Sequence, residues 1–144
     1  MLPAGSKAPQ FESLDERLQN GPVLVAIYKI SCPVCQLTLP FLSRIAGAGL
    51  QILAISQDDA AATNRFETRF GVALPTVLDR EEETYPIANA FGVTHVPSLF
   101  LIEPDGVISL AVEGFVKADL EAIAARAGAP IFRADESVPA WKAG

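Results

Sequence analysis

The sequence predicts an α/β fold with a central mixed sheet, made of parallel strands plus a C-terminal antiparallel hairpin and flanked by helices. Two observations carry this prediction. Between residues 13 and 92, apolar segments of strand length alternate with segments of helical periodicity, which implies right-handed crossovers between parallel strands. Further on, two apolar segments flank the turn Glu103–Gly106, which is typical of a hairpin.

The N-terminal half supplies the first elements. Ser13–Glu16 matches a capping box, so we expect a helix there that ends at Asn20-Gly21. Val23–Tyr28 is continuously apolar and rich in β-branched residues, as expected for a strand covered on both faces. A helix follows over residues 33–46, with an apolar residue at every fourth position and a kink at Pro40.

The next elements continue the alternation. Leu50–Ser56 reads as a second buried strand, and Asp58 or Asp59 caps a helix that Gly71 ends. Pro75–Leu78 predicts a short strand, since its proline cannot donate a ladder hydrogen bond.

The C-terminal part completes the fold. A brief helix begins around Pro86 and ends at Gly92. The hairpin strands are expected at residues 98–102 and 107–112, and the last helix at residues 119–127.

The length and composition define the class of protein. A chain of 144 residues, half of them hydrophobic, fits one ordered domain, which we place at residues 1–128. Residues 129–144 are expected to form a C-terminal extension or tail, with Phe132 and Trp141 as the candidates that pin it to the domain. The net charge of −6, without a basic cluster, gives no footprint for nucleic acid. The longest apolar stretch, residues 22–28, is too short to span a membrane.

The location and assembly follow from similar arguments. Met1–Lys7 lacks the basic start and apolar centre of a secretory signal, so we expect a cytoplasmic protein. A periplasmic or exported location is the alternative if a signal peptide has been removed. We expect a monomer.

The only two cysteines lie in one window, Cys32–Cys35. If Cys32 is the N-cap of the helix, Pro33 falls at the first helical position, where its missing N–H costs nothing. The following N–H groups and the helix dipole then favour a thiolate at Cys32. We expect Cys32 to attack as the exposed nucleophile and Cys35, one turn deeper, to resolve the mixed disulfide. Lys29 lies close enough in sequence to tune these thiols.

Two other interpretations of the cysteine pair are weaker. A CxxC can be half of a zinc site, but zinc needs about four ligands and the only further candidate is His95. An inert structural disulfide would add little stability, because the gain from loop closure grows with loop length. We therefore expect redox chemistry, with no metal and no cofactor.

Several segments resemble a known family. Cys32–Cys35, with Pro40 five residues after the second cysteine, resembles the active-site helix of thioredoxins. Gly5–Phe11 and Ala90–Gly106 are similar to the redoxin branch, also named alkyl hydroperoxide reductase/thiol-specific antioxidant. The extra helical segment between the second strand and Pro75 fits the TlpA-like thiol-disulfide oxidoreductase subgroup. The resemblance covers residues 5–127 and implies a thioredoxin-like fold.

The resemblance also implies a substrate site. Pro97 would be the cis-proline facing the disulfide, and the backbone of Val96 would pair with an extended segment of the substrate. The implied partners are protein disulfide substrates and an upstream thiol reductase.

The sequence departs from the family where a proton acceptor is expected. Thioredoxins carry an aspartate where this chain has Ala26, and cytochrome-maturation relatives carry a glutamate where it has Thr38. Without these carboxylates, the proton of Cys35 would go to water, to Thr38 as a relay, or to His95. The alternative for His95 is a partly exposed loop residue whose ring points elsewhere.

Two other functions stay open. Redoxin-family peroxidases use a Pro-x-x-x-Thr-x-x-Cys signature ending at a position that matches Cys35. Here Tyr28 replaces the proline and Cys32 the threonine, which counts against a peroxidase. A metal- or partner-binding module on a thioredoxin scaffold is the third hypothesis, because a fold alone does not fix a function.

Overall fold

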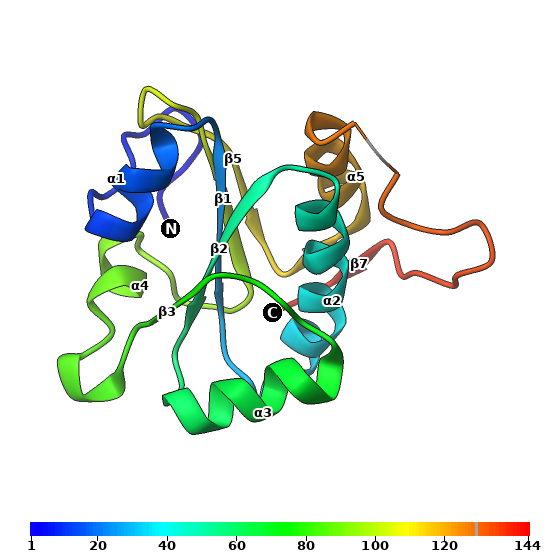
Figure 1. Ribbon diagram of the computed structural model, residues 1–144, viewed down its shortest axis with the longest axis horizontal. Helices are drawn as coiled ribbons and strands as arrows, with labels where there is room; N and C mark the ends of the chain where they lie inside the picture. Colours follow the sequence, from blue (N-terminus) through cyan, green and yellow to red (C-terminus); the bar gives the residue numbers. More distant parts are fainter. Residues whose placement is uncertain (129) are drawn as a thin grey trace.

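A computed structural model describes residues 1–128 and 130–144. Its main sheet has five strands in the order β3-β2-β1-β4-β5 (Figure 1). The strands are β1 Val23–Tyr28, β2 Gln51–Ser56, β3 Thr76–Leu78, β4 Ser98–Ile102 and β5 Ile108–Glu113. β1, β2 and β3 are parallel, whereas β4 runs antiparallel to both β1 and β5. The predicted mixed sheet with a late hairpin is confirmed.

Helices cover both faces of this sheet. They are α1 Glu12–Leu18, α2 Pro33–Gly47, α3 Ala60–Phe70, α4 Pro86–Ala90 and α5 Lys117–Arg126, with a 3-10 turn at Glu81–Glu83. In Figure 1, α1 and α4 lie on one side of the sheet, and α2 and α5 lie on the other. The five helices and the five strands of the main sheet follow one another in the predicted order, whereas the 3-10 turn was not predicted.

The central strand β1 is buried on both faces. All six of its side chains are shielded from solvent. Alternate residues enter two separate apolar clusters, because side chains of a strand point to opposite faces in turn. The cluster that contains Cys35, α2 and α5 takes Leu24, Ala26 and Tyr28. The cluster beneath α1 and α4 takes Val23, Val25 and Ile27.

Two helix starts refine the sequence prediction. The first helix begins at Glu12 with Phe11 as its N-cap and no capping side chain, so the Ser13 capping box is wrong. Of the two candidate caps for α3, Asp59 accepts the Ala62 N–H at 2.8 Å. Asp58 is therefore left to bond elsewhere, and it accepts the Ile30 N–H in the loop before Cys32.

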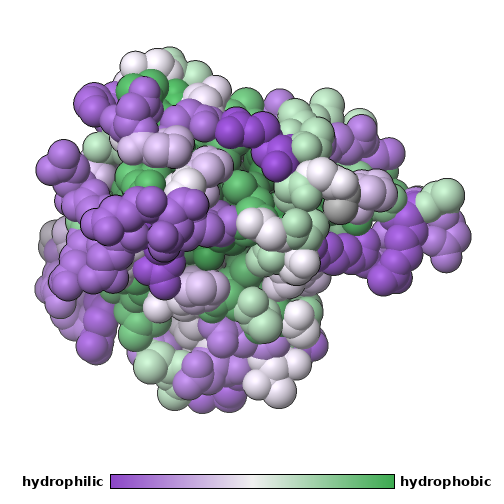
Figure 2. Space-filling view, turned by 45° about the horizontal axis from the view of Figure 1, so that its top comes forward, coloured by the Kyte–Doolittle hydropathy of each residue, from purple (hydrophilic) through white to green (hydrophobic). Residues whose placement is uncertain are grey.

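The chain after α5 does not leave the molecule as a free tail. It projects from the body as a loop with a hydrophilic outer surface and then returns along α2 (Figures 1 and 2). On the way, Arg44 of α2 holds Glu136 through two hydrogen bonds of 2.7 and 2.8 Å. The ring of Phe132 packs against Phe41 with centroids 4.8 Å apart.

The returning chain forms a second, two-stranded antiparallel sheet. Its strands are β6 Phe115–Val116 and β7 Trp141–Lys142. The predicted domain boundary after residue 128 stays a prediction, and residue 129 lies outside the described residues. Among the residues that the structure describes, no helix is both long and apolar enough to cross a membrane.

Candidate active site

Cys32 lies where β1 gives way to α2 and is the N-cap of that helix. Its sulfur accepts the backbone N–H of Cys35 at 3.3 Å, and Pro33 occupies the first helical turn as predicted. The Cys32 thiol in turn donates to the carbonyl oxygen of Val96 at 3.4 Å. Cys32 is partly exposed, so its sulfur is available to a reagent from outside. The helix N-terminus supplies positive potential at this atom.

Cys35 is one turn further along α2 and is completely buried. Burial raises the pKa of its thiol far above the usual range, and the neighbouring Cys32 sulfur and the Asp58 carboxylate raise it further. A backbone hydrogen bond at Lys29 opposes these effects without cancelling them. Cys35 therefore keeps its proton at neutral pH, whereas Cys32 faces the solvent as a free thiol.

The loop before the cysteines is held by hydrogen bonds to both the N–H and the carbonyl of Ile30. The Ile30 N–H donates to the Asp58 carboxylate at 2.8 Å, and the Ile30 carbonyl accepts from the Gln36 side chain at 2.9 Å. These bonds tie the loop to the start of α3 on one side and to α2 on the other. Sequence reasoning missed Gln36, whose side chain reaches back six residues across the turn, and considered Asp58 only as a cap, because its contact with Ile30 spans 28 residues.

Across from Cys32, the Val96–Pro97 peptide bond is cis. The loop is held by the Ser98 hydroxyl, which donates to the His95 carbonyl at 2.7 Å. The cis-proline implied by the family resemblance is therefore present. Its loop brings the Val96 carbonyl to the Cys32 sulfur, as the hydrogen bond from Cys32 shows.

Two expected proton-handling residues point to other partners. The buried Thr38 hydroxyl donates to the Val34 carbonyl of its own helix at 2.7 Å. The His95 ring is exposed, and its Nδ1 lies 2.8 Å from the Glu113 carboxylate. The proposed relay through either residue stays a prediction, and it requires that these bonds be exchanged first.

The third residue, Lys29, turns to the other face of the sheet. Its Nζ lies 5.8 Å from the centre of the Tyr85 ring, on the side of α4. Strand alternation explains this, because its neighbour Tyr28 points into the cluster of Cys35. Burial raises the pKa of Tyr28 to about 12, so its phenol stays neutral beneath the cysteine pair.

Within residues 1–128 and 130–144, no three histidine, cysteine or acidic side chains lie together as a metal site would require. The paired thiols are thus the chemically distinctive group of the described structure. They combine an accessible sulfur at a helix start with a buried, protonated partner.

The model of the AhpC/TSA family matches residues 4–111, which spans the whole of the site described above. The chain belongs to the AhpC/TSA family. It is similar to the thiol-disulfide oxidoreductase ResA of Geobacillus thermodenitrificans, with 28% identity over 76% of this chain and 69% of the relative. It is also 29% identical to the thiol:disulfide interchange protein DsbE of Pseudomonas aeruginosa, over 69% of this chain and 54% of that protein.

Solved structures agree on the fold. The thioredoxin domain of a thiol-disulfide oxidoreductase from Bacteroides vulgatus superposes with a TM-score of 0.73 at 19% identity, over 88% of this chain and 98% of that one. A secreted disulfide oxidoreductase of Mycobacterium tuberculosis, homologous to DsbE of E. coli, gives a TM-score of 0.64 at 19% identity. The match covers 85% of this chain and 96% of that one. The predicted thioredoxin-like fold, redoxin branch and thiol–disulfide oxidoreductase class are confirmed.

Proposed function

We propose that the protein reduces disulfides of protein substrates through Cys32 as nucleophile and Cys35 as resolving thiol. The Cys32 thiolate attacks one sulfur of the substrate disulfide, forms a mixed disulfide and releases the other sulfur as a thiolate. Cys35 then loses its proton and attacks the Cys32 sulfur. The second substrate thiolate leaves, two electrons have passed to the substrate, and a Cys32–Cys35 disulfide remains for an upstream dithiol reductase to reduce.

The contrast in burial between the two cysteines carries this assignment of roles. Cys32 is partly exposed at the start of α2, where its sulfur accepts the Cys35 N–H at 3.3 Å, so a substrate disulfide can reach it. Cys35 is completely buried, so a substrate sulfur cannot reach it directly. It can act only on a partner that is already bonded to Cys32.

Substrate recognition is proposed at Val96 and Pro97. The Val96 carbonyl already contacts the Cys32 sulfur at 3.4 Å, so a peptide chain paired with Val96 would bring its disulfide to the nucleophile. Main-chain pairing of this kind tolerates many side chains, which suits protein substrates of varied sequence.

Two matched serine variants test the roles. With insulin as the disulfide substrate, Cys35→Ser is expected to accumulate a stable mixed disulfide through Cys32. Cys32→Ser is expected to form none, and neither variant should sustain turnover with dithiothreitol. Non-reducing mass spectrometry measures the adducts. Adducts on Cys35 in the Cys32→Ser variant, with consumption of hydroperoxide, would reverse the roles and assign a peroxidase.

The direction of electron flow and the compartment of the protein are related, because the reduction potential of the cysteine pair indicates both. The Mycobacterium tuberculosis structural relative is described as secreted, which supports an exported location over the cytoplasmic one. We propose that the reduction potential of the Cys32–Cys35 pair decides between them. A value near about −270 mV or below indicates a reductant, and a value near about −120 mV indicates a disulfide donor. We also propose a monomer in solution, which light scattering measures.

A further inference from the structure

The segment Trp141–Gly144 returns to the active site as a short strand. In β7, Lys142 pairs with Phe115 and Trp141 pairs with Val116. The ladder is extended by the Lys117 N–H, which donates to the Ala140 carbonyl at 3.0 Å. The segment thus runs along β6, whose preceding residue, Gly114, is bonded to the cis-proline loop.

The end of the segment lies directly on the Val96 peptide group. A side-chain carbon added to Gly144 would overlap the Val96 carbonyl oxygen and would lie 3.0 Å from its carbonyl carbon. This is the same carbonyl to which the Cys32 thiol donates. Figure 1 accordingly shows the end of the chain beside the N-terminal part of α2. Residues 141–144 therefore cover the backbone where an extended substrate is proposed to pair.

The fit depends on a second glycine on the facing strand. The Gly114 N–H donates to the Pro97 carbonyl at 2.8 Å, which places this residue beside the cis-proline loop. A side-chain carbon on Gly114 would overlap the Lys142 carbonyl oxygen. The main chain of residues 141–144 thus lies close to the backbone of both Gly114 and Val96. Neither Gly114 nor Gly144 leaves room for a side chain.

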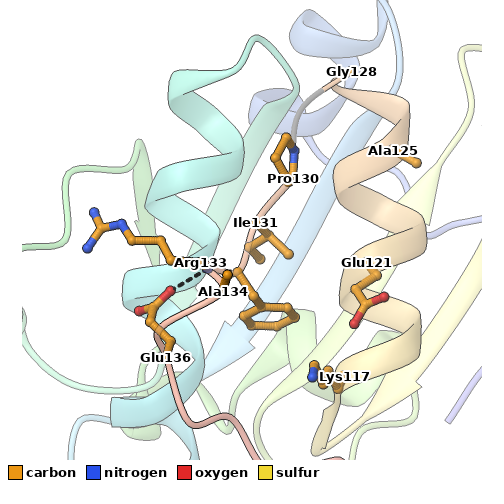
Figure 3. Close-up of a pocket in the computed structure, with 10 residues that line it drawn as sticks. Lys117, Glu121, Ala125, Gly128, Pro130, Ile131, Arg133, Ala134 and Glu136 are labelled. Carbon is orange, nitrogen blue, oxygen red and sulfur yellow. Dashed lines mark hydrogen bonds between the residues drawn. The ribbon is translucent and has the colours of Figure 1, made fainter.

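The stretch before the segment is anchored firmly, whereas the segment itself is held weakly. Figure 3 shows this stretch, which includes Ile131 and Glu136, between α2 and α5. The anchors are the paired hydrogen bonds from Arg44 to Glu136 and a third from Arg44 to the Ile131 carbonyl at 3.1 Å. By contrast, β7 has two residues, and Trp141 is 62% exposed. A weak strand on a short tether is displaceable but has a high effective concentration.

We propose that Trp141–Gly144 is an internal competitor for the substrate groove, and that this groove accepts an extended chain with glycine facing Val96. The proposal rests on the proposed function, because it regulates access to the same site. A protein substrate must displace the segment before it can pair with Val96. A small disulfide reagent needs only the Cys32 sulfur and does not compete with the segment.

The size of the effect follows from occupancy. A groove that is free only about one-fifth of the time raises the KM of its substrate about five-fold. The Gly144→Ala variant should remove this competition, because the added methyl group collides with backbone that cannot move aside. Gly47→Ala is the matched control, since a methyl group there meets nothing within 4 Å.

The experiment compares wild type, Gly144→Ala and Gly47→Ala as full chains. With insulin and dithiothreitol, KM should fall about five-fold in Gly144→Ala only. The rate with 5,5′-dithiobis(2-nitrobenzoate) should be the same in all three. A synthetic peptide of residues 136–144, followed through the amide resonances of Val96 and Gly114, should bind Gly144→Ala about five-fold more tightly than the other two proteins.

The outcomes separate this proposal from the proposed function. Equal peptide affinities in the three proteins, or a higher KM in Gly144→Ala, would overturn the internal competitor. A parallel change with the small reagent would also overturn it, because the segment would then shield Cys32 itself. If no protein reduces insulin but the peptide binds Gly144→Ala more tightly, the competitor stands and the reductase activity is refuted.

Discussion

Because the buried Cys35 thiol keeps its proton, the free energy of unfolding of the reduced protein should fall as the pH becomes alkaline. The folded state raises the pKa of this thiol well above the usual range, mainly by burial. A thiol whose pKa is raised by folding contributes its full stabilisation at pH values below the ordinary thiol pKa. This contribution is lost as the pH rises toward the folded pKa. Between about pH 8.5 and the folded pKa, the unfolded chain gives up the proton while the folded chain keeps it, so unfolding becomes easier.

The magnitude follows from linkage. One proton released on unfolding lowers the free energy of unfolding by up to about 1.4 kcal/mol per pH unit. With an ordinary thiol pKa of about 8.5 to 9, the loss between about pH 7.5 and 9.5 is roughly 1 kcal/mol. The Cys32→Ser background leaves Cys35 as the only thiol, which assigns the effect to one residue.

The assay is urea unfolding followed by far-ultraviolet circular dichroism at these two pH values. It compares Cys32→Ser with the double variant Cys32→Ser/Cys35→Ala, which has no thiol. The single variant should lose roughly 1 kcal/mol more than the double variant on going to the higher pH. An equal loss in both proteins would refute the reasoning, because Cys35 would then titrate alike when folded and unfolded.

Three further predictions concern neighbouring groups. Asp79→Ala should lower the free energy of unfolding by about 2–3 kcal/mol, measured in urea, because two backbone N–H groups of α4 lose their acceptor; Asp79→Asn should lose less. The Arg44 guanidinium lowers the pKa of Glu136 to about 2, so this anchor is present above about pH 4.3 and is lost as the pH falls toward about 2. Trp141 fluorescence should change over that range, and Glu136→Gln should show the change at neutral pH. Thr38→Val should leave the pH profile of kcat unchanged, since the hydroxyl already donates within its helix; a shifted profile would restore Thr38 as a relay.

Much of the fold is local in origin and was therefore predictable. The apolar run of β1, the proline at the start of α2 and the glycine after α3 each fix a boundary through their own backbone preferences. The predicted start of α1 lies two residues too late because Ser13 looks like a cap, whereas Phe11 takes that position without a capping side chain. Propensity at a helix end is easily overridden by packing.

The site divides in the same way. The sequence places Cys32 at the helix start and Cys35 one turn deeper, because a spacing of three positions determines that geometry by itself. The bonds from Asp58 and Gln36 to Ile30, by contrast, join positions that no local pattern relates. The strand at Trp141–Lys142 was likewise beyond prediction, since two residues carry no periodicity and their partner lies in β6.

The absence of a carboxylate at Ala26 and Thr38 acquires a physical meaning in this structure. Cys35 is buried with a raised pKa, so resolution of the mixed disulfide needs a path for its proton. Asp58 is the carboxylate whose charge acts on Cys35. It follows β2 and is bonded to the loop before Cys32, because it accepts the Ile30 N–H. Its charge opposes formation of the Cys35 thiolate, so resolution of the mixed disulfide must overcome both burial and this charge.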